Sequence, residues 1–304
     1  MGAICVLGMI KNKTWFQGRL LAWFAKNRRD LPWRKTHDPY KILVSEIMLQ
    51  QTQVDRVIPK YKAFLKLFPT VRALASASPA KVIQAWSGLG YNRRALYLKA
   101  AAEAVIKNHG GIFPESLVDL ETLPGVGAYT ARAIAAFVFE KDEGPVDTNI
   151  SRVLHRWFSG VEVPKRKVSL AQLANRAEEM VPTGKGWVWN HAMMDFGALV
   201  CTAKRPKCKS CPMRAHCTAY PKITTITWSR ISHRVSQKFE NSNRYWRGKI
   251  IELLRHATGH SLALSHVVEV LGSGMTLAML QPLLAGLVKD GLVILRKSRI
   301  ILPR

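Results

Sequence analysis

The sequence LPGVGAYTARAIAAFVFEKDEGPVDTNISRVLHR, residues 123–156, decides the fold. It opens with the turn Leu123–Gly127, whose proline and two glycines cannot lie inside a helix. Good helix formers follow over Ala128–Phe139, so the first N–H groups of that helix and those of the turn point outward together. This arrangement is typical of phosphate sites, although a glycine turn also serves as a plain chain reversal. Gly125 and Gly127 are the candidate phosphate contacts.

An acidic residue, Asp147, ends the loop after this helix and precedes a second helical pattern. Its simplest interpretation is an N-cap, whose carboxylate accepts hydrogen bonds from the first N–H groups of the next helix. The alternative is a carboxylate that lies near a bound phosphate and takes part in chemistry. Residues outside this stretch have to decide between the two roles.

Glu46 is a second notable acid, because its sequence neighbours are apolar. The segment Tyr40–Ile58 is predicted to form one helix, with Glu46 at its centre. An ionised carboxylate is costly to bury there unless it is paired, so we expect a raised pKa, as a general acid near neutral pH requires. The alternative places Glu46 on a polar seam with Gln50 and Gln53.

The composition predicts a polyanionic partner. The chain has 304 residues, 48% of them hydrophobic, which is enough for two domains, and 46 basic against 20 acidic residues give a net charge of +26. Nucleic acid explains this excess best. A membrane surface is the rival, but the segment Gly2–Ile10 is too short and lacks the basic start of a signal peptide or anchor. We therefore expect a reducing, cytoplasmic compartment and no membrane contact.

Four cysteines lie within seventeen residues, in the pattern C-x6-C-x2-C-x5-C. They are Cys201, Cys208, Cys211 and Cys217. Such a group in a reduced protein predicts a metal site. The central C-x2-C suits zinc, and a [4Fe–4S] cluster also takes four cysteines, so the spacing leaves both open.

The remaining helical patterns show no strand-like alternation before residue 220, which predicts an all-α fold. One glycine-rich turn, Ser87–Arg94, separates two of these helices. It is either a contact to the DNA backbone or a simple chain reversal. The candidate contacts in it are Gly88, Leu89, Tyr91 and Arg93.

The C-terminal region has a different character. Polar residues 224–243 predict a linker, and residues 244–304 predict a small winged-helix-like domain of three helices and a hairpin. The predicted helices are Arg247–His256, Leu264–Leu271 and Thr276–Lys289, and the predicted hairpin pairs Leu292–Leu295 with Ile300–Leu302. Residues 221–304 contain 13 basic and 4 acidic residues, which favours a DNA contact over a protein contact.

These motifs together resemble the helix-hairpin-helix (HhH-GPD) DNA glycosylases, over residues 14–220, and most of all the adenine DNA glycosylases of the MutY family. The resemblance is carried by Leu31–Trp33, Ser45–Val54, Trp86–Tyr91 and Asn190–Ala198, besides the hairpin, the aspartate and the cysteines. It implies a two-lobed glycosylase domain over residues 1–223, with a six-helix lobe (about 36–142) inserted in a terminal lobe. It also implies an iron–sulfur loop at 201–217 that binds [4Fe–4S] rather than zinc.

The resemblance further implies the reaction, hydrolysis of the bond between a mispaired adenine and its deoxyribose after the nucleotide is flipped out of double-stranded DNA. Glu46 would protonate the leaving base, and Asp147 would stay ionised and stabilise the oxocarbenium-like sugar. Tyr129 and Asn149 would lie beside the sugar. The other implied contacts are Gln50 and Gln51 at the gap in the duplex, and Trp33, Arg34 and His191 at the base pocket.

One position that separates subclasses, and two departures from the family pattern, affect the expected activity. Bifunctional relatives carry a lysine nucleophile where Tyr129 stands, so we expect a monofunctional enzyme. We also expect a monomer that is cytoplasmic and nucleoid-associated, of prokaryotic type. The usual Nudix-like C-terminal domain, which reads 8-oxoguanine, is replaced by the winged-helix-like tail. His191 and Thr148 also differ from the commoner residues. Adenine opposite 8-oxoguanine or guanine is the expected substrate, with thymine or uracil mispairs, or a non-catalytic iron–sulfur DNA-binding regulator, as alternatives.

Overall fold

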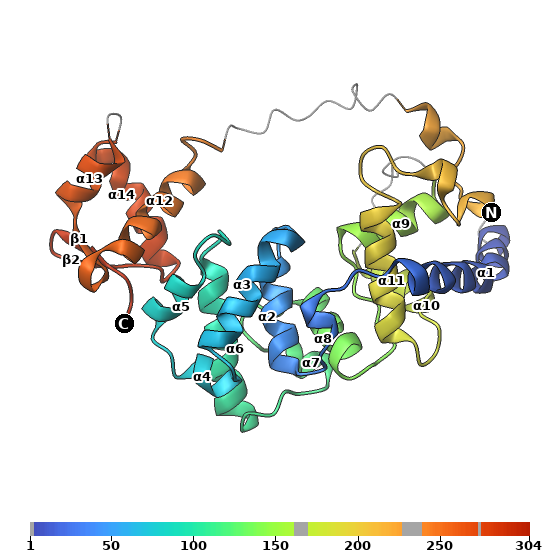
Figure 1. The fold of residues 1–304 in the computed structure, drawn as a ribbon, viewed down its shortest axis with the longest axis horizontal. Helices are drawn as coiled ribbons and strands as arrows, with labels where there is room; N and C mark the ends of the chain where they lie inside the picture. The colour runs from blue at the N-terminus through green and yellow to red at the C-terminus, as the bar shows by residue number, and fades with distance from the viewer. Residues whose placement is uncertain (1–2, 161–169, 227–238, 273–274) are drawn as a thin grey trace. The chain divides into compact units, whose positions relative to one another are not determined.

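The computed structural model describes residues 3–160, 170–226, 239–272 and 275–304 (Figure 1). The chain forms two compact units. Unit 1 comprises Met1–Asp38, Glu115–Leu117 and Gly127–Ser232, and unit 2 comprises Pro39–Pro114, Val118–Val126 and His233–Arg304. Helices dominate both units, and the only strands among the described residues are three short ones near the C-terminus, so the all-α prediction is confirmed. Among the described helices, none combines the length and apolarity needed to span a bilayer.

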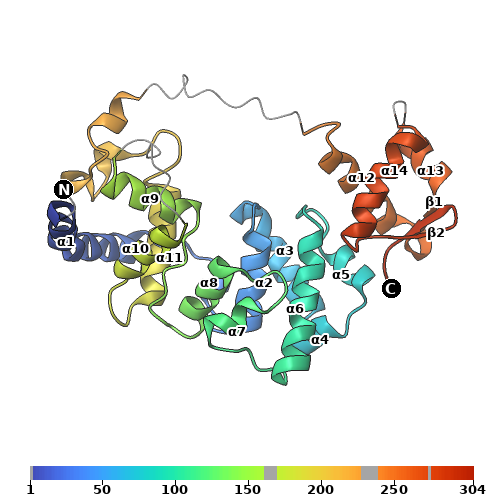
Figure 2. The same cartoon turned by 180° about the vertical axis from the view of Figure 1, so that it is seen from behind.

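Unit 1 is built around the packing of α1, α9 and α11. Its helices are α1 (Ala3–Asn27), α8 (Ala128–Val138), α9 (Thr148–Phe158), α10 (Leu170–Glu179) and α11 (Gly186–Leu199), with 3-10 turns at Pro32–Arg34, Cys208–Ser210, Arg214–His216 and Lys222–Thr225. Helices α9 and α11 lie side by side in both views (Figures 1 and 2). Phe16 of α1 packs edge-on against Trp157 of α9, with ring centroids 4.6 Å apart, and against Trp189 of α11 at 5.9 Å. This aromatic core fixes the helices that carry the functional residues of unit 1.

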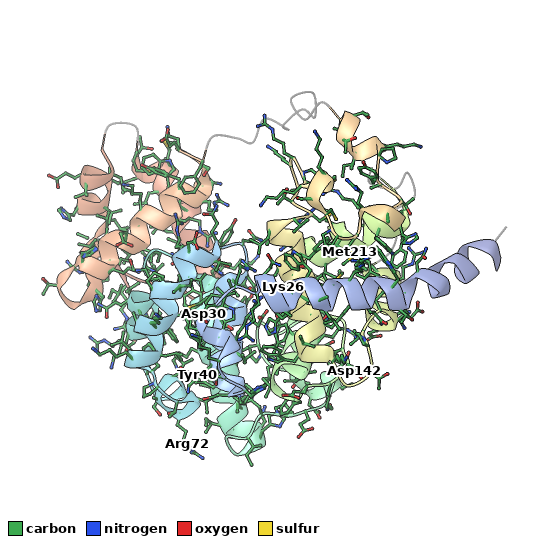
Figure 3. All side chains as sticks on the ribbon, turned by 45° about the vertical axis from the view of Figure 1, so that its right-hand side comes forward. Lys26, Asp30, Tyr40, Arg72, Asp142 and Met213 are labelled. Carbon is green, nitrogen blue, oxygen red and sulfur yellow. The ribbon has the colours of Figure 1, made fainter. Side chains whose placement is uncertain are left out.

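The first helices of unit 2 differ from the prediction at one point. They are α2 (Pro39–Leu49), α3 (Val54–Leu67), α4 (Val71–Ala75), α5 (Pro79–Ala85), α6 (Arg93–His109) and most of α7 (Leu117–Glu121). The single helix expected over residues 40–58 is therefore wrong, because the chain turns between α2 and α3 and Gln51 adopts a left-handed φ of 55°. Tyr40, labelled in Figure 3, anchors the start of α2 by donating from its hydroxyl to the Phe68 carbonyl at 2.7 Å.

The C-terminal part of unit 2 contains three helices and a small sheet. They are α12 (Asn243–His256), α13 (Leu264–Leu271), α14 (Leu277–Lys289), β1 (Ser261–Ala263), β2 (Ile294–Arg296) and β3 (Arg299–Ile301). The three predicted helices are confirmed, although α12 starts at Asn243 and not at Arg247, and the hairpin is confirmed with its strands shifted to Ile294–Arg296 and Arg299–Ile301. The sheet is antiparallel with the order β1-β3-β2, so it gains a strand, β1, that its three-residue length hid from the sequence pattern. Residues 227–238 of the predicted linker lie outside the described residues.

Candidate functional site

Glu46 lies on a buried helix of unit 2. It is 6% exposed, and its neighbours in α2 from Ile42 to Met48 are all buried. The helical seam with Gln50 and Gln53 that was offered as an alternative is interrupted, because α2 ends at Leu49 and Gln53 is instead the N-cap of α3. The carboxyl of Glu46 is therefore held in a largely apolar helix, as expected.

The end of α2 is joined to the turn Ser87–Arg94 by the side chain of Arg94, which is 7% exposed. Its Nη1 donates to the carbonyls of Ile47 at 2.8 Å, Met48 at 2.9 Å and Gln50 at 2.5 Å. Its Nη2 donates to the carbonyls of Leu89 at 3.0 Å and Gly90 at 3.1 Å, and to the Thr52 hydroxyl at 3.0 Å. Burial lowers the pKa of Arg94 to about 10, so it remains a cation at neutral pH and complements the negative end of α2.

These hydrogen bonds make Arg94 a clamp on the backbone. Two exposed residues lie beside the clamp, and both have a left-handed backbone conformation. Gln51 has a φ of 55° and Tyr91 a φ of 46°, a conformation that costs free energy in any residue but glycine. Tyr91 is 40% exposed. The Arg94 guanidinium lies over its ring, with Cζ 5.6 Å from the ring centroid. Arg94 thus holds two strained turns in place. Its exposed neighbour Arg93, the residue predicted to contact DNA, instead pairs with Asp290 at 3.3 Å, and the role of Arg94 was not predicted.

Leu89, another predicted contact, is buried and offers the clamp only its carbonyl. The turn Leu123–Gly127 buries Leu123 and Val126 and leaves both glycines exposed. Gly125 has a φ of 79°, and a Cβ atom there would lie 2.7 Å from the Cβ of Tyr97, so only glycine fits.

Asp147 of unit 1 is the N-cap of α9. Its Oδ1 accepts from the backbone N–H of Asn149 at 2.9 Å and of Ile150 at 2.7 Å, and its Oδ2 accepts from the Asn149 side-chain amide at 2.9 Å. The N-cap interpretation is therefore correct. Capping the helix does not exclude a further role for this carboxylate in chemistry.

The start of α9 is pressed against α11 at Gly197. A Cβ atom on Gly197 would lie 2.7 Å from the Cβ of Asn149, so a larger residue would displace the cap. Arg152, one turn further along α9, donates to the Gly197 carbonyl at 2.6 Å, to Asn149 Oδ1 at 2.8 Å and to the Cys201 carbonyl at 2.8 Å. Arg156, the next turn, donates to the carbonyls of Thr202 and Ala203 at 2.6 and 2.9 Å. These two arginines, which the sequence analysis also missed, join the Asp147 helix to the cysteine loop.

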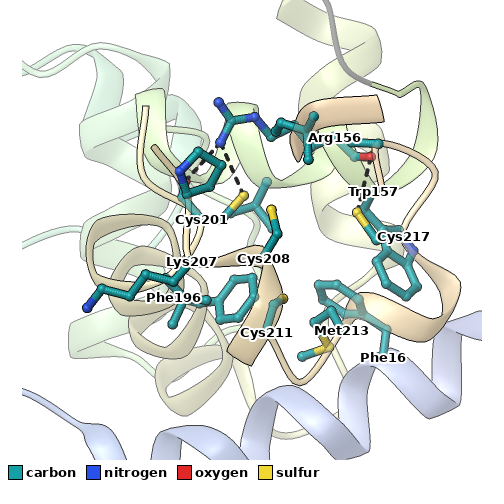
Figure 4. A pocket seen from close by; sticks show the side chains of 15 residues that line it. Phe16, Arg156, Trp157, Phe196, Cys201, Lys207, Cys208, Cys211, Met213 and Cys217 are labelled. Atoms are coloured by element: carbon teal, nitrogen blue, oxygen red, sulfur yellow. Dashed lines mark hydrogen bonds between the residues drawn. The ribbon is translucent and has the colours of Figure 1, made fainter. Parts of the chain in front are cut away.

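The four predicted cysteines line one cavity of unit 1 (Figure 4). Apolar side chains such as Phe16 and Met213 form much of the rest of its wall, and Arg156 Nη1 lies 3.5 Å from Cys201 Sγ. Burial raises the pKa of the Cys208, Cys211 and Cys217 thiols, that of Cys211 to about 12. A positive metal centre is what would make such buried thiols into thiolate ligands.

The spacing of these thiols bears on which metal group they fit. In the described part of the chain, no three His, Cys, Asp or Glu side chains converge closely enough to hold a single ion. Four thiols around one shared cavity are a ligand set that zinc and an iron–sulfur cluster both accept.

The residues predicted for a base pocket lie in unit 1, and one of them, Arg34, belongs to an ion-pair network. Asp195 is fully buried and accepts from Arg34 Nη1 and Nη2, both at 2.8 Å, and from Arg29 Nε at 2.6 Å. Burial opposes ionisation of Asp195, but these donors outweigh it and lower its pKa. His191 stacks on Phe137 with ring centroids 4.2 Å apart, and burial holds its pKa well below the usual value. His191 is therefore neutral.

Two of the remaining predicted residues complete the placement. Trp33, 5% exposed, lies in the 3-10 turn Pro32–Arg34, and Tyr129 is half-buried in the first turn of α8. The predicted site residues fall into two sets. Unit 1 brings together the Asp147–Asn149 cap and the cysteine loop, and unit 2 brings together Glu46, Gln51 and the turn Ser87–Arg94.

Comparison with known proteins defines the class first. Residues 44–179 match the model of the HhH-GPD superfamily base excision DNA repair proteins. A thermostable thymine-DNA glycosylase of known structure superposes with a TM-score of 0.66 at 34% identity, over 70% of this chain and 99% of the other.

Curated relatives define the family. The adenine DNA glycosylase of Mycolicibacterium smegmatis is 40% identical over 245 residues, which cover 79% of this chain and 80% of the relative. The human adenine DNA glycosylase is also 40% identical, over 69% of this chain but only 40% of the human protein. The chain belongs to the adenine DNA glycosylase family, and is a DNA-binding enzyme of base excision repair.

Proposed function

We propose that this protein hydrolyses the N-glycosidic bond of an adenine mispaired with 8-oxoguanine or guanine in double-stranded DNA. The contrast between its two acids is the observation that carries the proposal. Glu46, buried in an apolar helix, retains a proton and delivers it to the leaving adenine. Asp147, which accepts three hydrogen bonds at the start of α9, stays ionised and stabilises the positive charge that develops on the sugar.

The exposed turns supply the grip on DNA. Gly125 and Gly127 bind a phosphate through backbone N–H groups, Gln50 and Gln51 fill the gap that the flipped nucleotide leaves, and Tyr91 also contacts the DNA. The net charge of +26 supports this assignment, because cations that replace counterions dominate the affinity for DNA.

Tyr129 and Asn149 lie beside the sugar in this proposal, and Trp33, Arg34 and His191 belong to the base pocket. Tyr129 has no amine that could form a Schiff base, so the enzyme is monofunctional and leaves the DNA backbone intact. It acts as a monomer in the cytoplasm.

The four cysteines hold a [4Fe–4S] cluster in this proposal. The shared cavity, the apolar wall and the four thiols fit such a group. When bound, the cluster supplies a rigid, charged anchor for residues 201–217. Arg152 and Arg156 of α9 donate hydrogen bonds to carbonyls of this loop, so an ordered loop also holds α9 and its Asp147 cap in position.

Residues 244–304 form a winged-helix domain in this proposal, and residues 1–223 form the glycosylase domain. Three helices followed by an antiparallel hairpin support the first assignment. The exposed basic residues of the hairpin, such as Lys297, support a role in DNA binding.

A panel of duplexes tests the function. The purified protein is incubated with A:8-oxoguanine, A:G, T:G and U:G mispairs, and strand scission is measured with and without alkali. We expect scission at adenine only, and only after alkali. A thymine-specific product would favour the second candidate, a mismatch thymine glycosylase, which Thr148 and the likeness to a thymine-DNA glycosylase support. Release of no base from any duplex would leave a DNA-binding regulator.

A further inference from the structure

The C-terminal part of unit 2 packs directly on α5. Ile83 of α5 is fully buried in the same apolar cluster as Ile250 of α12 and Leu284 of α14. At the end of the chain, the Ala80 N–H donates to the Pro303 carbonyl at 2.9 Å. The three C-terminal helices therefore share a core with the helix that precedes the turn Ser87–Arg94.

A buried arginine fixes α12 against that turn. The Arg255 side chain is 7% exposed and pairs with Glu252 at 2.6 Å. Its Nε donates to the Ile83 carbonyl at 3.0 Å, and its Nη2 donates to Asn92 Oδ1 at 2.9 Å. Because Asn92 belongs to the turn, the position of α12 relative to Tyr91 is set by direct hydrogen bonds.

This packing leaves a groove of about 870 Å³ between α12 and the two strained turns. Gln51, Tyr91 and Arg244 are among the residues that line it. The Arg244 guanidinium lies 4.8 Å from the Phe239 ring centroid and 5.1 Å from that of Tyr91, and also donates to the Tyr91 hydroxyl. The groove thus has a wall of stacked planar groups.

The lining is strongly basic. One acid, Asp290, lies among five arginines, and it pairs with two of them, Arg93 and Arg247. The five are Arg56, Arg93, Arg94, Arg244 and Arg247. Side-chain amides, including those of Gln51 and Asn243, complete the lining. Guanidinium groups for phosphates, flat rings for stacking and amides for base edges are the groups that bind nucleotides.

We propose that this groove binds the DNA strand opposite the adenine, with a phosphate of that strand paired to Arg244, which the Tyr91 ring holds in place. This inference rests on the proposed function, because Gln51 is the link. A side chain that fills the gap left by a flipped adenine contacts the base across the gap, which belongs to the opposite strand. Since Gln51 also lines the groove, that strand continues onto α12, and the C-terminal domain becomes part of the substrate site.

The test measures binding in full-length Asp147→Asn protein, so that DNA is not consumed. Affinity for an A:G duplex is measured by fluorescence anisotropy over a range of salt, and each strand is footprinted with hydroxyl radicals. Arg244→Ala should weaken binding about tenfold and lower the salt slope by about one. It should also remove protection from the strand opposite the adenine.

Two controls keep the result specific. Lys249→Ala removes a cation from the same helix outside the groove lining and should leave affinity and footprint unchanged. Arg244→Lys should keep the salt slope while it loses affinity, because an ammonium cannot stack as a guanidinium does. Unchanged binding in Arg244→Ala, or lost protection confined to the adenine strand, would overturn the inference. Release of adenine by the wild-type protein is scored separately, so its absence would count against the proposed function and not against the groove.

Discussion

Glu46 and Asp147 are held in opposite environments. Asp147 caps a helix, where its two oxygens accept three hydrogen bonds, while Glu46 lies within a helix whose neighbouring residues are all buried. In each case an arginine stabilises the helix that carries or follows the acid. Arg94 binds the carbonyls at the end of the Glu46 helix, and Arg152 joins the Asp147 helix to the cysteine loop. The comparison teaches that backbone contacts can place the same functional group either in a hydrogen-bonded cap or in an apolar helix, and the proposed mechanism uses that contrast.

The largest expected effect comes from removing that contrast. Glu46→Gln or Asp147→Asn should slow adenine release by about 10³-fold or more while the protein still binds the duplex, because the first loses the transferable proton and the second the negative charge. Single-turnover release and anisotropy binding check this. Glu121→Gln, an exposed site, is the control. Full activity in either variant would remove the two-acid mechanism.

The next effect concerns the support behind Asp147. Cys217→Ser should abolish the visible absorbance of an iron–sulfur cluster and lower the thermal midpoint by about 5–10 °C, because the free energy of metal binding is also folding free energy and each kcal/mol lost lowers the midpoint by about 2–4 °C. Cys5→Ser, outside the cluster pattern, should change neither. A colourless wild-type protein that contains zinc would contradict the cluster.

The support behind Glu46 is tested by Arg94→Met. Several buried carbonyls would lose their donor, so the free energy of unfolding should fall by about 2 kcal/mol, and DNA affinity should fall because Gln51 and Tyr91 lose their common anchor. Urea unfolding and anisotropy measure the two effects. Arg93→Met changes a largely exposed side chain and should leave stability nearly unchanged. Equal stability losses would show that Arg94 is no clamp.

The smallest effect is the pH dependence of stability that the buried imidazole of His191 contributes. The pKa of His191 lies well below 6.5 because of burial and the nearby Arg34 cation. As the pH falls below about 6.5, the unfolded chain binds a proton that the folded chain does not, so the free energy of unfolding should decrease by up to about 1.4 kcal/mol per pH unit. Urea unfolding between pH 7.5 and 5.5 should show a shallower decrease in His191→Gln. Parallel pH profiles would contradict a neutral, buried histidine.

Much of this arrangement could be predicted from sequence. The helix Leu264–Leu271 was predicted to the residue, because an apolar period of 3.6 is a local signal. The break after Leu49 was missed, because no glycine or proline marks Gln50–Gln53 and a distant guanidinium stabilises the turn. Local patterns carry no information about such long-range donors.

Arg94 illustrates a signal that was present but unused. Two adjacent arginines look equivalent by composition. Helical spacing places Arg94 on the same face of α6 as Leu98, Ala101 and Val105, which are all fully buried, while Arg93 points elsewhere. A cation on an apolar face predicts a buried structural role, and its partners could be found only from the fold.

The left-handed backbone at Gln51 and Tyr91 has a consequence for protein engineering. Glycine at residue 51 would relieve backbone strain of about 1 kcal/mol, so a library selected for heat tolerance would sample it, whereas glycine at residue 91 would also remove the ring contacts with Arg94 and Arg244. Each change would also delete a side chain that lines the groove proposed to bind DNA. Selection for robustness alone would therefore erode substrate binding, and any thermostabilised form of this enzyme should be screened on duplex affinity at residues 51 and 91 first.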